Sequence, residues 1–208
     1  MKKVLAIFLS VILLTITGCS MSPEEIQTNM LLKLNNKYET TFVESDIIDV
    51  HENHGNLIYY FGKRDNLFDT TDIFAVVYNK NANEITDNYS ACILERDIID
   101  RVTKATEQEC YVYVNTVSYP ITMNKYTDLY SYINENSGKI SFNVYICSDT
   151  MIDVDKLKDN YQQEFKTSGT VNIEVLSSDM YEAIKNQDAD TYSKYKNTDK
   201  LYVGTINW

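Results

Sequence analysis

Two histidines and an aspartate lie close together in the chain and could bind a metal ion. Asp49 and His51 are two residues apart, so on a β-strand their side chains point to the same face. His54 follows in a polar segment, and imidazole and carboxylate groups are ligands that Zn²⁺ accepts. A solvated hairpin turn has the same composition, and the sequence does not locate the remaining ligands of a complete site. Asp49, His51 and His54 are therefore candidate metal ligands, and a polar turn is the alternative interpretation.

Tyrosine is abundant, with 17 residues against one tryptophan. Because tyrosine offers a large amphipathic contact area, the candidate binding residues are four tyrosines in predicted strands, Tyr59, Tyr60, Tyr111 and Tyr113. Tyrosine also suits half-buried strands that bind nothing. The sequence leaves both interpretations open.

Several signatures of common catalytic centres are missing. The sequence contains no GxSxG, no GxGxxG and no phosphate-loop motif, and no histidine lies beside a serine. Cys92, Cys110 and Cys147 include no CxxC pair and are interpreted as small buried side chains, while a bridge between Cys110 and Cys147 stays open. We therefore expect a protein that is not an enzyme, with no catalytic residues and no dissociable cofactor.

The composition excludes several other classes of protein. With 208 residues, 44% of them hydrophobic, and only two prolines and six glycines, the chain can bury a core and is neither disordered nor collagen-like. The net charge of -11, from 19 basic and 30 acidic residues, argues against a nucleic-acid partner, since neutralising phosphates requires clustered lysines and arginines.

Residues 1–18 have the pattern of an export signal. Lys2 and Lys3 precede an apolar run over residues 4–16. This run is shorter than the roughly 20 residues that a membrane-spanning helix needs. It fits the hydrophobic region of a cleavable signal.

The apolar run ends with an aliphatic residue, which is followed by two small residues and a cysteine. Ile16, Thr17, Gly18 and Cys19 resemble the lipobox of bacterial lipoproteins. The resemblance implies cleavage before Cys19 and covalent attachment of diacylglycerol and a fatty acyl chain to that residue. It also implies a chain anchored by its lipid on the outer, extracytoplasmic face of the cell membrane, where two acyl chains give a stable anchor.

Three further motifs resemble small uncharacterised lipoproteins of Gram-positive-type bacteria: Lys37-Tyr38-x-x-x-Phe42, Phe74-Ala75-Val76-Val77 and Asp87-Asn88-Tyr89. This resemblance implies no known activity. The absence of catalytic motifs favours a non-enzymatic module that binds a peptide, a cell-wall fragment or an envelope protein. The alternative is a metal-dependent envelope protein or enzyme centred on Asp49, His51 and His54.

The elements that position these residues are predicted from periodicity and caps. Ser22, Pro23 and Glu25 form a capping box that begins a helix ending near Tyr38. The predicted elements that follow are strands over 42–50, 57–61 and 72–78, and a helix capped by Asp87 and Asn88 that reaches residue 102.

The second half of the chain alternates between the two element types. The predicted strands cover 111–117, 140–147, 171–176 and 201–206, and the predicted helices cover 124–136, 153–166 and 179–187. The predicted fold is α+β: an N-terminal helix, a three-stranded antiparallel sheet and a helix, followed by alternating strands and helices in a mixed sheet. The expected modules are 19–106 and 107–208, with one continuous domain over 22–208 as the alternative.

Overall fold

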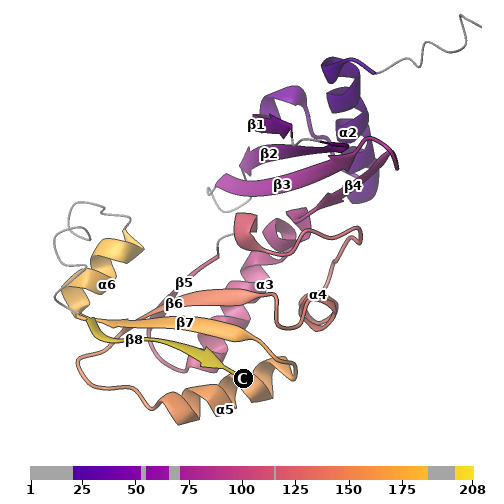
Figure 1. The fold of residues 1–208 in the computed structure, drawn as a ribbon. Helices are drawn as coiled ribbons and strands as arrows, with labels where there is room; N and C mark the ends of the chain where they lie inside the picture. The colour runs from indigo at the N-terminus through magenta and orange to yellow at the C-terminus, as the bar shows by residue number, and fades with distance from the viewer. Residues whose placement is uncertain (1–20, 53–54, 66–70, 115, 187–199) are drawn as a thin grey trace, which may run out of the picture. The chain divides into compact units, whose positions relative to one another are not determined.

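The computed structural model describes five stretches of the chain, residues 21–52, 55–65, 71–114, 116–186 and 200–208 (Figure 1). The predicted export signal and Cys19 lie outside these residues. The chain divides into two compact units, Met1–Glu44 and Ser45–Trp208. The predicted module boundary after residue 106, and its alternative of one continuous domain, stay predictions.

Helix α2, Pro23–Tyr38, is the main described element of the first unit. Its start is fixed by two reciprocal hydrogen bonds: the Glu25 N–H donates to Ser22 Oγ at 3.2 Å, and the Ser22 N–H donates to Glu25 Oε2 at 2.7 Å. The helix ends at Glu39, whose left-handed backbone has a φ of 55°. The predicted helix and its capping box are confirmed.

Sheet A opens the second unit and consists of β1 (Ile47–Glu52), β2 (Leu57–Asp65), β3 (Thr71–Asn79) and β4 (Glu84–Asp87). The strands pair antiparallel in the order β1-β2-β3-β4. The predicted sheet had three strands, and the first was expected to begin at residue 42. In the structure a 3-10 turn, η1 (Glu44–Asp46), precedes β1, and β4 is a fourth strand. Four residues are too few for a period-2 pattern to stand out, so β4 is defined by its pairing with β3.

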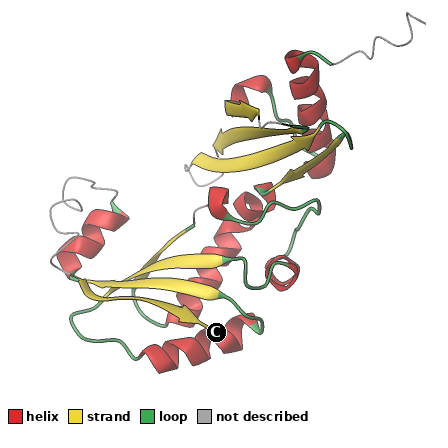
Figure 2. Ribbon diagram, viewed as in Figure 1, coloured by secondary structure: helices red, strands yellow, loops and turns green. Residues whose placement is uncertain are grey.

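Sheet B contains β5 (Cys110–Tyr113), β6 (Ser141–Cys147), β7 (Thr170–Leu176) and β8 (Lys200–Asn207). The strands are adjacent in the order β5-β6-β7-β8, with β6 and β7 parallel and the outer two pairs antiparallel. The sheet is therefore mixed, as predicted. Figure 2 shows the separate strands and helices of this α+β fold.

The helices of the second unit are α3 (Tyr89–Thr106), α4 (Leu129–Glu135), α5 (Val154–Phe165) and α6 (Ser178–Lys185), with a 3-10 turn η2 (Thr116–Ser118). Helix α5 connects the parallel strands β6 and β7, because a parallel pair requires a crossover. Within the described part of the chain, no helix is both long and apolar enough to cross a membrane.

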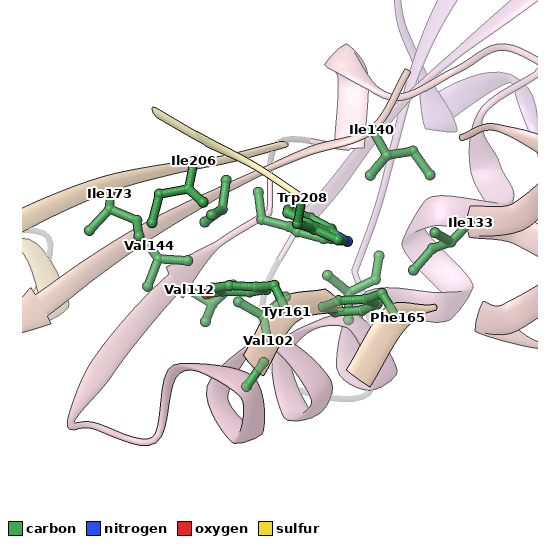
Figure 3. Close-up of a cluster of buried hydrophobic side chains, with 14 of the residues drawn as sticks. Val102, Val112, Ile133, Ile140, Val144, Tyr161, Phe165, Ile173, Ile206 and Trp208 are labelled. Carbon is green, nitrogen blue, oxygen red and sulfur yellow. The ribbon is translucent and has the colours of Figure 1, made fainter. Parts of the chain in front are cut away.

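One face of sheet B forms the main hydrophobic core, together with side chains from α3, α4 and α5. Trp208 lies among aromatic rings there, with its centroid 5.1 Å from that of Tyr161 and 5.5 Å from that of Phe165 (Figure 3). Gly169 exchanges two backbone hydrogen bonds with Trp208, and a Cβ at position 169 would collide with the indole. Glycine is therefore required for the close approach of this ring.

The fully buried side chain of Asn88 joins sheet A to η2. Asn88 Oδ1 accepts the Ala75 N–H at 2.7 Å, and the Asn88 N–H donates to the Ala75 carbonyl at 3.2 Å. Ala75 lies just beyond the last β3 residue that pairs with β4, and these two bonds give its backbone N–H and C=O hydrogen-bond partners. Asn88 Nδ2 donates to the Thr116 carbonyl at 2.8 Å and to the Tyr119 carbonyl at 3.4 Å. One amide therefore satisfies backbone groups in two separate segments.

The predicted capping role at the start of α3 is divided between two residues. Asp87 Oδ1 accepts the Tyr89 N–H at 3.0 Å, whereas Asn88 occupies the N-cap position without a side-chain capping bond. The Asn88 amide instead makes the bonds to β3 and η2. The predicted helix start is confirmed, but the asparagine has a different role from the one expected.

We expect Asn88→Ala to lower the free energy of unfolding by about 2 kcal/mol, because it leaves the buried Ala75 N–H without its acceptor and removes one donor from the Thr116 carbonyl. The measurement is urea denaturation of the purified protein. Asn81→Ala, at an exposed turn residue, is the matched control and should change stability by less than about 0.5 kcal/mol. Equal losses in the two variants would contradict the role of Asn88.

A second prediction compares two buried tyrosines. Tyr161 Oη lies 2.7 Å from Thr106 Oγ1, whereas the Tyr132 hydroxyl has no hydrogen-bond partner among the described residues. Burial raises the pKa of both hydroxyls, so both are neutral at pH 7. Tyr161→Phe should lower the free energy of unfolding by about 1 kcal/mol, while Tyr132→Phe should leave it unchanged or raise it. Urea titration followed by the fluorescence of Trp208, the single tryptophan, measures both; a larger loss for Tyr132→Phe would contradict the argument.

Candidate binding surface

The face of sheet B opposite the core carries side chains that cross the sheet in register; we call it the outer face. The first row comprises Tyr113, Asn143, Asn172 and Thr205, which are direct neighbours on β5 to β8. The second row comprises Tyr111, Tyr145, Glu174 and Val203. Because strand side chains alternate, the residues between these positions face the core.

Hydrogen bonds between strands fix the first row. Asn172 Nδ2 donates to Asn143 Oδ1 at 3.0 Å, and Thr205 Oγ1 donates to Asn172 Oδ1 at 3.1 Å. An asparagine side chain offers two N–H donors and two acceptor sites, so these bonds leave polar capacity unused. Tyr113, 47% exposed, ends the row on β5. The row therefore presents oriented amide groups beside an accessible aromatic ring.

Helix α6 covers one end of the outer face. Met180 and Tyr181 of α6 pack with Leu176, and Tyr111 and Tyr145 pack against this small cluster. Figure 1 places α6 beside the end of sheet B where β7 ends and β8 begins. In the first row, Tyr113 and Thr205 are exposed, and Asn143 and Asn172 are half-buried. The first row is therefore partly open to solvent.

The second row changes from aromatic to charged to aliphatic across the sheet. The rings of Tyr111 and Tyr145 stack with centroids 6.3 Å apart. Glu174 forms an ion pair with Lys200 at 2.6 Å, so its charge is compensated. Val203 is 60% exposed on β8. The row therefore contributes apolar contact area without a net charge.

The four tyrosines proposed from the sequence lie on two sheets. Tyr111 and Tyr113 share the outer face of sheet B, and burial raises the pKa of Tyr111. Tyr59 and Tyr60 are consecutive on β2 and point to opposite faces of sheet A. Tyr60 is only 2% exposed, whereas Tyr59 is half-buried. Only Tyr111 and Tyr113 therefore contribute to the outer face.

Two of the three proposed metal ligands are adjacent in the structure. His51 Nε2 lies 2.9 Å from Asp49 Oδ2, and both side chains are exposed on β1. The His51 ring also meets Phe61 edge to face, with centroids 5.7 Å apart. His54 lies outside the described residues. Among the residues that the structure does describe, no group of three histidine, cysteine, aspartate or glutamate side chains could hold a metal ion, and the proposed site stays a prediction.

Cys110 and Cys147 are free thiols, and the buried Cys92 Sγ lies 3.9 Å from the Ile73 carbonyl oxygen. Cys110 packs against the core and Cys147 lies on the opposite face with α6, so the bridge left open by the sequence does not form. Burial and the nearby carboxylates of Glu109, Asp149 and Glu182 raise the pKa of the Cys147 thiol. A nucleophilic cysteine needs a lowered pKa, so this thiol is not activated.

Sequence reasoning did not identify the amide row. Asn143 and Asn172 each alternate with apolar residues in their strands, and this marks them as outward-facing. The pattern does not show that they are neighbours, because strand register is set by pairing of segments far apart in the chain.

Comparisons with protein-family models, curated proteins and solved structures find no match to the chain.

Proposed function

We propose that the chain is a lipoprotein anchored through Cys19 on the extracytoplasmic face of the cell membrane, where it acts as a non-enzymatic binding module. The anchor is inferred from the residues around Cys19, and the outer face of sheet B is the proposed binding surface. The partner is a peptide or an envelope protein. The membrane lipid holds the chain in place, and the folded body carries the recognition surface.

The observation that carries this proposal is the first row of sheet B, in which two half-buried asparagines lie between the exposed Tyr113 and Thr205. Its amides are held by bonds of 3.0 and 3.1 Å, so they lose little conformational freedom when a ligand binds. Tyr113 adds an accessible ring with a polar tip at the end of the row. Rigid amides beside an aromatic ring suit recognition of a polar ligand with an apolar portion, such as a polypeptide.

Charge limits the partner's chemistry. The chain carries a net charge of -11, which attracts basic partners and repels acidic ones at low ionic strength. Removal of residues 1–18 would also remove Lys2 and Lys3, leaving 17 basic against 30 acidic residues, a net charge of -13. Such a body is repelled by anionic lipid headgroups, so the acyl chains alone would hold it at the membrane.

Site-specific crosslinking in cells tests the binding surface. A photo-crosslinking amino acid at position 113 should capture a discrete partner that the same amino acid at position 130 does not. Tyr130 is the matched control, because it is 57% exposed but lies on α4, outside the outer face. Tyr113→Ala should then weaken binding of the purified partner by about tenfold. Equal capture at both positions would contradict the proposal.

The lipid anchor has a separate test. Cells fed a labelled fatty acid should incorporate the label into the wild-type chain and into Cys147→Ala, but not into Cys19→Ala. Cys19→Ala should also leave the membrane fraction once its signal is removed, because the acyl chains supply the membrane affinity. A Cys19→Ala chain that is cut before position 19 and still sediments with membranes would refute the anchor.

A further inference from the structure

Strand β8 forms one edge of sheet B, and the phase of its hydrogen bonds shows which backbone groups face outward. Gly169 and Trp208 exchange two N–H···O bonds of 3.3 Å, which fixes the phase of the ladder between β7 and β8. In an antiparallel ladder, bonded pairs alternate with non-bonded pairs. By the register of this pair, the N–H and C=O groups that point away from β7 belong to Val203, Thr205 and Asn207.

These outward groups have no partner strand within the described residues, since β8 pairs there only with β7. The side chains of Val203 and Thr205 lie on the outer face and belong to its two rows. Leu201 and Val203 are 46% and 60% exposed, and both are aliphatic. The edge therefore combines unpaired backbone groups with apolar side chains.

The other three sheet edges in the described part of the chain are short or interrupted. Strands β4 and β5 have four residues each. At the end of β4, Asp87 already pairs with Thr122 through an isolated antiparallel β-bridge. Strand β1 has a register shift after Ile47 and carries the charged Asp49. Charges, irregular register and short length are the features that normally protect edges from added strands.

Strand β8 lacks these protections over most of its length. It has eight residues and no proline. Its register shift falls at its beginning, opposite Leu176. Its one charged residue, Lys200, is paired with Glu174. From residue 201 onward the edge is uncharged, and from Tyr202 to Asn207 it is regularly paired with β7 on its inner side.

We propose that the β8 edge binds an extended polypeptide segment of neutral or basic character, which adds to sheet B as a further strand. The inference rests on the proposed function, because the same residues belong to the outer face. Alternating N–H and C=O groups are complementary to another strand, and side-chain contacts then supply selectivity. Leu201 and Val203 favour apolar residues in the segment. The net charge of -11 disfavours acidic segments and a second copy of the chain.

The test is a selection of displayed random twelve-residue peptides on the purified chain, followed by affinity measurement with the enriched peptides. Val203→Pro removes an outward N–H but no bond to β7, and proline is tolerated at such edge positions. Val203→Thr keeps the N–H and is the matched control. Enriched peptides should be poor in proline and acidic residues. They should bind Val203→Pro about tenfold more weakly than Val203→Thr.

A second measurement uses the unmodified chain, so its result does not depend on whether Val203→Pro folds correctly. Methylation of alternate backbone nitrogens in an enriched peptide, on its pairing side, should abolish binding, while methylation on the other side should not. Failure to enrich any peptide, or equal binding of both methylated forms, would overturn the proposal. A chain that is dimeric without peptide and monomeric as Val203→Pro would assign the edge to a second copy and would also overturn it.

The same peptides separate this inference from the proposed function. Loss of binding in Tyr113→Ala with full binding in Val203→Pro would support the outer face and overturn the β8 edge. Loss in Val203→Pro alone would support the edge and count against the first row as a contact surface. Loss in both variants, with both folded by circular dichroism, is the expected result.

Discussion

The buried amide of Asn88 is the interaction on which the arrangement of the second unit depends. Strand β3 extends beyond its pairing with β4, so its backbone groups at Ala75 need other partners. The Asn88 backbone and side chain supply them, and the same side chain satisfies the carbonyls of Thr116 and Tyr119. In a low-dielectric interior, each of these groups would be costly if left unpaired. Helix α3 begins at the next residue, so one side chain ties the start of this core helix to sheet A and to η2.

The sequence predicted well those elements whose signals are local. The capping box of Ser22 and Glu25 involves residues three positions apart, and the structure contains both of its hydrogen bonds. Helix α5 and the strands β6 and β7 likewise follow clear periodicities, and they form the expected parallel unit. The short strand β4 and the tertiary role of Asn88 were missed, because both depend on partners elsewhere in the chain.

The candidate surface shows the same limit. The positions of Tyr113 and Asn143 on strands were predicted. The row that joins Tyr113 to Thr205 exists only because four strands pair in one register, across 92 residues of chain. Sequence patterns identify which face a residue occupies, but pairing decides its neighbours. A surface built from separate strands is therefore visible only in the folded chain.

Along β8, side chains that face the core alternate with side chains that lie on the outer face. Ile206 packs in the core of sheet B and Tyr202 packs against it, while Val203 and Thr205 take no part in that core. From Tyr202 onward, the even-numbered positions face the core, whereas the odd-numbered positions are free of that packing constraint. In the proposed mode of binding, substitution at the odd positions would change which peptides are preferred at little cost to the fold. One strand would then allow binding preference to change while the scaffold is retained.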